Sequence, residues 1–138
     1  MTAVRGSEDF AAVLDSLIVC KFLRKCFSDF YAEAAELLQK VTGWPYSAAE
    51  LRRTGERINT LKKLFNQRQG WQPADDWLPP RLLTESLATG VAAGVHLTAP
   101  ELRGMIQGYY KARGWDQQGF VLNTKLQELN LDKAGQEQ

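Results

Sequence analysis

The chain repeats apolar residues at helical intervals and shows no sustained alternation of apolar and polar residues. Its longest pattern starts at Ser47, which stands in the capping-box relation to Glu50, so that each side chain is placed to accept a backbone N–H of the other. The apolar positions that follow are Leu51, Ile58 and Phe65, with Thr54 and Leu61 between them. Such a period places side chains on one helix face. The sequence therefore predicts an all-α fold, a multi-helix orthogonal bundle.

Two helices are predicted before this one. The first carries Phe10, Val13, Leu14 and Leu17 at intervals of three and four, and the second has Tyr31, Ala34, Leu38 and Val41 on one side. The second is expected over about 28–42. Gly43 follows it at the position of a left-handed cap, and Pro45 prevents continuation.

Two more helices are predicted near the C-terminus. A second capping box, Thr98 with Glu101, starts a helix that Gly114 ends. A short last helix over about 124–129 is expected to pack through Leu126 and Leu129, and the polar tail after Leu131 is expected to fray.

One long irregular segment, about 70–97, separates these two groups of helices. It contains three prolines and three glycines without a sustained period, and it is longer than a compact domain usually tolerates without a functional reason. Gly90 and Gly94 form no phosphate loop, because no strand precedes them and no Gly-Lys-Ser/Thr follows. His96 has no histidine partner for a metal, and no role is assigned to it.

Composition favours one soluble domain. The 138 residues are 44% hydrophobic, which is enough for one core, so we expect a single domain over 1–131 and a tail over 132–138. A formal charge of +1 makes nucleic acid a poor partner, and the sequence has neither a signal peptide nor a membrane span, so a cytoplasmic location is expected. Cys20 and Cys26 are too few for a disulfide framework or a zinc site.

Six short motifs occur in a specific order. They are Asp15-Ser16-Leu17-Ile18-Val19-Cys20-Lys21-Phe22, Val41-Thr42-Gly43-Trp44, Gly55-Glu56-Arg57-Ile58-Asn59, Leu64-Phe65-Asn66-Gln67-Arg68-Gln69-Gly70, Leu78-Pro79-Pro80-Arg81 and Tyr109-Tyr110-Lys111-Ala112-Arg113-Gly114-Trp115-Asp116. Over about 4–131 this ordered set resembles the C-terminal domain of the tungsten-containing aldehyde:ferredoxin oxidoreductases.

The resemblance implies specific roles for the first motif. By position, Asp15 would bind a pterin of the tungsten-bispterin cofactor, which is of the molybdopterin type, and Cys20 would be the fourth ligand of a [4Fe-4S] cluster. Val19 would contact the pterin through its backbone. The family's pattern has glycine where this chain has Ile18. From the residues alone, Asp15 could equally be a solvated carboxylate and Cys20 a small buried hydrophobe.

The resemblance also implies what this chain needs from elsewhere. The other three cluster cysteines lie upstream in the family, so the chain is expected to be a piece of an oxidoreductase that is inactive alone and binds no cofactor by itself. Its partners would be the upstream domains or a separate subunit, with ferredoxin accepting electrons from aldehyde oxidation. The motifs do not distinguish tungsten from molybdenum, name the aldehyde or assign a role to Cys26.

Two other function classes remain open. The chain could be a free-standing helical interaction module, or a degenerate remnant without cofactor, that exposes an apolar face around Leu14, Leu17 and Cys20; a helical nucleic-acid binder is a third possibility. Glu56 is expected to pair along its helix or with Arg52. The basic residues Arg52, Arg53, Lys62 and Lys63 could dock an acidic electron carrier.

Overall fold

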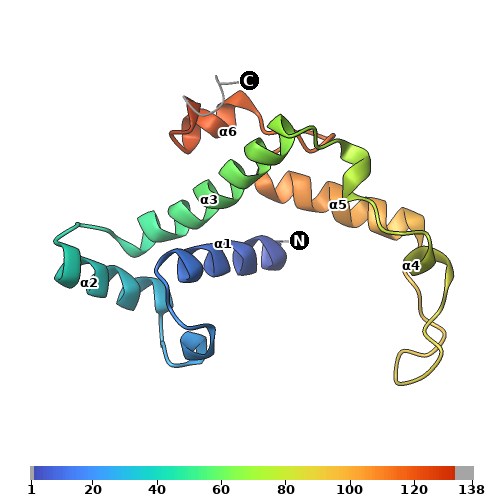
Figure 1. The fold of residues 1–138 in the computed structure, drawn as a ribbon, viewed down its shortest axis with the longest axis horizontal. Coiled ribbons are helices and arrows are strands. Elements are labelled where there is room, and N and C mark those ends of the chain that lie inside the picture. The colour runs from blue at the N-terminus through green and yellow to red at the C-terminus, as the bar shows by residue number, and fades with distance from the viewer. Residues whose placement is uncertain (1, 133–138) are drawn as a thin grey trace.

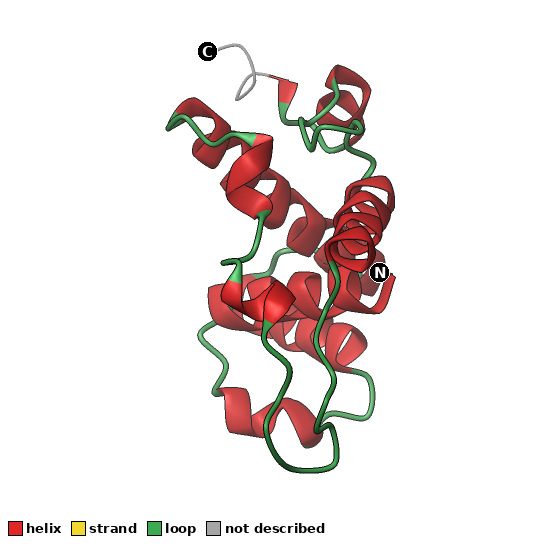
Figure 2. Ribbon diagram, turned by 90° about the vertical axis from the view of Figure 1, so that its right-hand side faces the viewer, coloured by secondary structure: helices red, strands yellow, loops and turns green. Residues whose placement is uncertain are grey.

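The computed structural model describes residues 2–132, and within that range it contains helices and loops but no strand (Figures 1 and 2). The elements are α1 (Thr2–Ser16), the 3-10 helix η1 (Lys21–Lys25), α2 (Phe30–Thr42), α3 (Ala48–Arg68), the 3-10 helix η2 (Pro73–Asp76), α4 (Arg81–Thr84), α5 (Ala99–Arg113) and α6 (Asn123–Glu128). The predicted all-α fold is confirmed. The predicted tail lies outside the described residues, apart from Asp132.

The helix ends follow the local signals closely. Asp29 caps α2 by accepting hydrogen bonds from the backbone N–H groups of Tyr31 and Ala32, and Gly43 ends it at φ 77°. The capping box of Thr98 and Glu101 starts α5, and Gly114 ends that helix at φ 70°. These boundaries were predictable because each depends on neighbouring residues alone.

Only one of the two hydrogen bonds of the capping box predicted at the start of α3 is formed. Ser47 accepts the backbone N–H of Glu50 at 3.1 Å. The Glu50 carboxylate, however, accepts a hydrogen bond from Arg57 at 3.1 Å, further along the helix. A basic partner on the same helix therefore takes the place of the reciprocal bond of the capping box.

The seven-residue pattern predicts the buried face of α3 at its start but not at its end. Leu51 is buried as predicted, whereas Leu61 and Phe65 are 47% and 53% exposed. The other buried residues of α3 are Gly55, Thr60, Lys63 and Leu64. The buried face shifts because different neighbours cover the two halves of the helix: Leu51 joins α1 and α2, whereas Leu64 packs with residues of and after α6.

Two apolar clusters make up the core. The first joins α1, α2 and the start of α3 through Val13, Leu14, Phe30, Ala34, Ala35 and Leu51. Phe10 packs edge-on against Phe30 at 4.7 Å between ring centroids. The second cluster holds α6 against α3 through Leu64, Leu126, Leu129 and Leu131, as predicted for Leu126 and Leu129. Val41, predicted to face inward from α2, is 82% exposed.

Helices α1 and α3 cross with almost no separation at Gly55. A Cβ atom at Gly55 would lie closer than 3.0 Å to the carbonyl carbon and oxygen of Asp9. Packing therefore requires glycine at position 55. Backbone conformation does not require it, because the φ of Gly55 is not positive. The close approach brings the buried Asp9 within reach of Asn59, one turn further along α3.

The segment predicted as irregular is mostly loop, interrupted by η2 and α4. Its first part is fixed to the core: the Trp71 indole N–H and the Tyr110 hydroxyl both donate to the Asp76 carboxylate, at 2.9 and 2.6 Å. Its last part folds back on itself, because the Leu87 N–H donates to the Val95 carbonyl and the Gly94 N–H donates to the Leu87 carbonyl. This part extends away from the helices (Figure 1).

Among the described residues, no helix is long and apolar enough to cross a bilayer.

Replacing Gly55 by alanine is expected to lower the free energy of unfolding by roughly 1–3 kcal/mol, because the new methyl group forces α1 and α3 apart. Gly104, in α5, has no neighbouring atom within 4 Å of the point that an alanine methyl group would occupy. Gly104→Ala should therefore raise stability by about 0.5–1 kcal/mol, as expected for an unobstructed helical glycine. Urea unfolding of both variants measures the difference. If both substitutions changed the free energy of unfolding equally, the close crossing of α1 and α3 at Gly55 would be contradicted.

Candidate functional site

The end of α1 turns back on itself in a way that displays the first sequence motif. The N–H of Val19 donates to the Leu14 carbonyl at 3.0 Å, and the N–H of Ile18 donates to the Asp15 carbonyl at 3.1 Å. This pair of bonds is a Schellman motif, with Val19 packed on the core cluster that contains Leu14. The motif needs a left-handed residue at its centre, and Ile18 occupies it at φ 57°.

Ile18 is an unusual residue for this position. A left-handed conformation costs an L-residue about 1–2 kcal/mol, and a β-branched side chain is especially unsuited to it. The side chain is 92% exposed, so tertiary packing does not explain the choice. Glycine, which the resemblance described above implies at this position, would adopt the left-handed conformation without this cost.

The Schellman turn brings Asp15 and Cys20 to the same end of α1. Both side chains are exposed, and neither forms a hydrogen bond or ion pair with another described residue. Val19 lies between them in the sequence with its side chain half-buried against the core, and its backbone N–H is the one bonded to Leu14. Cys20 then caps the start of η1.

Cys26 lies at the other end of η1, where its backbone N–H bonds to the Leu23 carbonyl. At about 2.0 Å per residue, the 3-10 helix separates the two cysteines by roughly 12 Å. That separation exceeds the reach of a disulfide. No group of three or more metal-ligating side chains occurs among residues 2–132, so Cys20 could contribute one ligand to a metal site but could not build one.

A cavity of about 500 Å³ lies beside this turn, between α1 and η1. Asp15 borders it from α1, and Lys21 and Arg24 border it from η1. The wall along α1 is formed by the small residues Ala3, Gly6, Ser7 and Ala11, together with Phe10 and Leu14. The predicted exposed apolar face needs correction here, because Leu14 is buried; the apolar side chains exposed around Cys20 are Ile18, Phe22 and Leu23.

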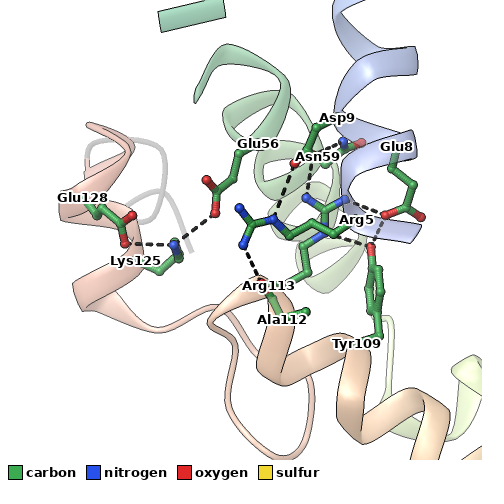
Figure 3. A network of polar contacts seen from close by, with 10 residues as sticks. All are labelled: Arg5, Glu8, Asp9, Glu56, Asn59, Tyr109, Ala112, Arg113, Lys125 and Glu128. Atoms are coloured by element: carbon green, nitrogen blue, oxygen red, sulfur yellow. Dashed lines mark hydrogen bonds and ion pairs between the residues drawn. The ribbon is translucent and has the colours of Figure 1, made fainter. Parts of the chain in front are cut away.

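A buried arginine holds the middle of α1 in place (Figure 3). The guanidinium of Arg113, at the end of α5, donates to Asp9 at 2.6 Å and to Glu8 at 2.5 Å. Its side chain is fully buried. Burial acts to lower the pKa of Arg113, but its hydrogen bonds to the two carboxylates outweigh burial and raise it.

Further polar contacts complete this network. The Tyr109 hydroxyl donates to Glu8 at 2.6 Å and accepts from Arg113 at 3.1 Å. Burial, reinforced by the Glu8 hydrogen bond, raises the pKa of Tyr109 to about 12. Asn59 donates to Asp9 at 2.8 Å, which ties α3 into the same network. Polar contacts with α3 and α5 thus fix the orientation of α1.

Sequence reasoning found the displayed motif but missed this network. Arg113 was visible only as part of the Arg-Gly-Trp-Asp run, and no signal linked it to Glu8 and Asp9, more than 100 residues earlier. The prediction for Glu56 was wrong: it accepts a hydrogen bond from Lys125 of α6 at 3.0 Å. Arg52 instead lies over the Tyr31 ring, 4.3 Å from its centroid.

The prediction that Lys63 belongs to a basic docking surface is also wrong, because its side chain is buried and only 7% exposed. Its ammonium lies 2.9 Å from the centroid of the Trp71 ring and 3.5 Å from Asp76. Burial lowers the pKa of Lys63, and the charge of Asp76 opposes that shift. Lys63 therefore fixes the loop after α3 and is not available for docking.

Known proteins of one family match almost the whole length of the chain. The family profile of aldehyde ferredoxin oxidoreductase, domains 2 and 3, matches residues 1–131. The chain is 35% identical over 125 residues to a tungsten-containing aldehyde ferredoxin oxidoreductase of Pyrococcus furiosus, covering 90% of this chain and 20% of that protein. It is 34% identical over 127 residues to the enzyme of the same name from Pyrococcus abyssi, with 91% and 20% covered.

Two more distant matches extend the comparison. A protein of Pyrococcus furiosus described as an aliphatic sulfonate oxidoreductase, WOR-like subunit, is 26% identical over 132 residues, covering 91% of this chain and 20% of that protein. The active-site complex BamBC of benzoyl coenzyme A reductase, solved with 1,5-dienoyl-CoA, shares the fold, with a TM-score of 0.62 and 20% identity over 78% of this chain and 15% of that one. The chain spans about a fifth of the length of the relatives it matches in sequence.

Ile18→Gly is expected to raise the free energy of unfolding by about 0.5–1 kcal/mol, because glycine removes the left-handed strain at little cost in packing. Asn130 is a matched control, since it has a similar φ of 56° but tolerates the left-handed region better. Asn130→Gly should change stability by less than Ile18→Gly. Thermal unfolding of the two variants measures this, and a destabilised Ile18→Gly variant would contradict the strain at this turn.

Arg113→Met is expected to cost about 3–5 kcal/mol of stability, because it leaves the Glu8 and Asp9 carboxylates without their buried partner. Arg103, an exposed arginine of the same helix, serves as control, and Arg103→Met should change stability by less than about 0.5 kcal/mol. Chemical unfolding followed by circular dichroism makes the comparison. Similar losses in both variants would show that the network contributes little.

Proposed function

The chain belongs to the aldehyde ferredoxin oxidoreductase family, and from this membership we propose that residues 1–131 form the domain that closes the cofactor site of a tungsten-dependent oxidoreductase. In this proposal Asp15 binds a pterin, the Val19 backbone lies against it, and Cys20 is one ligand of a [4Fe-4S] cluster. The observation that carries the proposal is the Schellman turn at Ile18, which displays Asp15 and Cys20 together, unpartnered, at one end of α1.

The residues present suit such cofactors chemically. Iron in a cluster takes thiolate ligands, normally four, and Cys20 offers one exposed thiol. A carboxylate only accepts hydrogen bonds, and a pterin presents ring N–H and amino donors, so an ionised Asp15 is a fitting partner. When bound, the tungsten pterin would supply two-electron oxidation of an aldehyde to a carboxylic acid, and the cluster would pass electrons singly to ferredoxin.

The contribution of this domain would be positional. Arg113, Glu8 and Asp9 set the orientation of α1, and α1 is continuous from Thr2 to Ser16, so the network and the turn move as one rigid unit. The remaining cluster thiolates would come from the other four fifths of the protein, or from a separate subunit. That partner would also cover Ile18 and Phe22, which are each 92% exposed.

A second candidate function is a free-standing helical interaction module without cofactor. The exposed side chains of Ile18 and Phe22 favour it equally well, since any protein partner could cover them. Cofactor content separates the two functions, because only the oxidoreductase domain requires the Cys20 thiolate.

Cys20→Ser is expected to lower cluster retention by about tenfold or more, because a hydroxyl is a poor substitute for a thiolate on iron. The measurement is iron content and electron paramagnetic resonance of the assembled complex, isolated through a tag on this chain. Cys26→Ser is the matched control and should keep the cluster. An unchanged spectrum in Cys20→Ser would refute the ligand role and favour the interaction module.

A further inference from the structure

The second half of α3 carries an apolar seam that the rest of residues 2–132 leaves half uncovered. Positions 51, 54, 58, 61 and 65 recur at alternating intervals of three and four, which is the spacing by which two helices pack along a shared seam. Leu51, at the start, is buried with α1 and α2. Further along, Ile58 is half-buried, and Leu61 and Phe65 are 47% and 53% exposed. Ile58, Leu61 and Phe65, here called the α3 seam, thus extend past the part of the helix that this domain covers.

The exposure of the α3 seam does not come from a loose helix. Leu64 packs with Leu126 and Leu129 on one side of it. Lys63 is buried, with its ammonium over the Trp71 ring. Rotating α3 to bury the seam would uncover these residues, so covering the seam requires a partner outside the described residues.

The surroundings of the α3 seam are basic. Residues 57–74 contain no aspartate or glutamate. Lys62, next to Leu61, is exposed, and the Arg68 guanidinium lies 5.9 Å from the centroid of the Phe65 ring. Two copies of this chain packed seam to seam would bring these like charges into one interface, which opposes self-association. Carboxylates on a different partner would instead complement them.

We propose that the α3 seam docks an amphipathic helix of a partner protein, whose apolar stripe is flanked by aspartate or glutamate. The stripe packs against Leu61 and Phe65, and the carboxylates face Lys62 and Arg68. A helix is the matching shape, because intervals of three and four place the seam side chains in one row along α3. This surface needs no cofactor, so the inference goes beyond the proposed function and does not depend on it.

The test uses two designed helical peptides with the same leucine stripe, one flanked by glutamate and one by lysine, each labelled with fluorescein and titrated onto the full chain at low salt. Fluorescence anisotropy should show that the wild-type chain binds the glutamate-flanked peptide about tenfold more tightly. Leu61→Ser with Phe65→Ser should weaken that peptide by about tenfold or more, because the apolar contact is lost. Lys62→Glu, at an exposed position, should weaken it by about two- to fivefold and strengthen the lysine-flanked peptide. Lys62→Glu carries the test even if the double serine variant does not fold.

Leu37→Ser with Val41→Ser is the matched control, since these α2 side chains are also exposed and also four residues apart, and they lie outside the α3 seam. The control should change the affinity of neither peptide. Equal affinity for the two peptides, no binding of either, or equal weakening by the α2 control would overturn the proposal. A dimer that Leu61→Ser with Phe65→Ser dissociates in light scattering would also overturn it, because the seam would then belong to a second copy of the chain.

Discussion

The buried ion pairs of Arg113 are the interaction on which the arrangement of the helices depends. The guanidinium at the end of α5 meets Glu8 and Asp9 in the first half of α1, and Asn59 of α3 shares Asp9. Three helices that are distant in sequence thus meet at one pair of acidic residues (Figure 3). A buried guanidinium is tolerated only with such complete pairing, so this contact leaves α1 little freedom to rotate.

The middle and the C-terminal end of α1 have different roles. The buried residues of this helix are Asp9, Ala12, Val13 and Leu14, and the close crossing of Asp9 with Gly55 admits no larger residue at position 55. The C-terminal end carries the Schellman turn, which points Asp15 and Cys20 away from the core. Because an α-helix is stiff over 15 residues, these buried residues determine where the turn at its C-terminal end lies. A domain of this kind would present a cofactor ligand accurately without enclosing the cofactor itself.

Part of the proposed site was readable from the sequence. The order of six motifs pointed to Asp15, Val19 and Cys20, and their role in cofactor binding stays a prediction. The structure adds that Asp15 and Cys20 flank the turn at Ile18 and that both are exposed. The family's glycine at the position of Ile18 also had a physical reason, since the turn requires a left-handed residue there. The cavity between α1 and η1 carried no signal in the sequence, because it is a property of the folded chain.

The sequence by itself determined the helices and most of their ends, through caps such as Asp29 and Thr98 and left-handed glycines such as Gly43 and Gly114. These signals act within a few residues of the chain, so no tertiary contact was needed to read them. The tertiary structure alone decided which faces are buried. Lys63 lies inside and Phe65 outside because α3 changes neighbours along its length, and Arg113 finds Glu8 and Asp9 only once α1 and α5 are packed together.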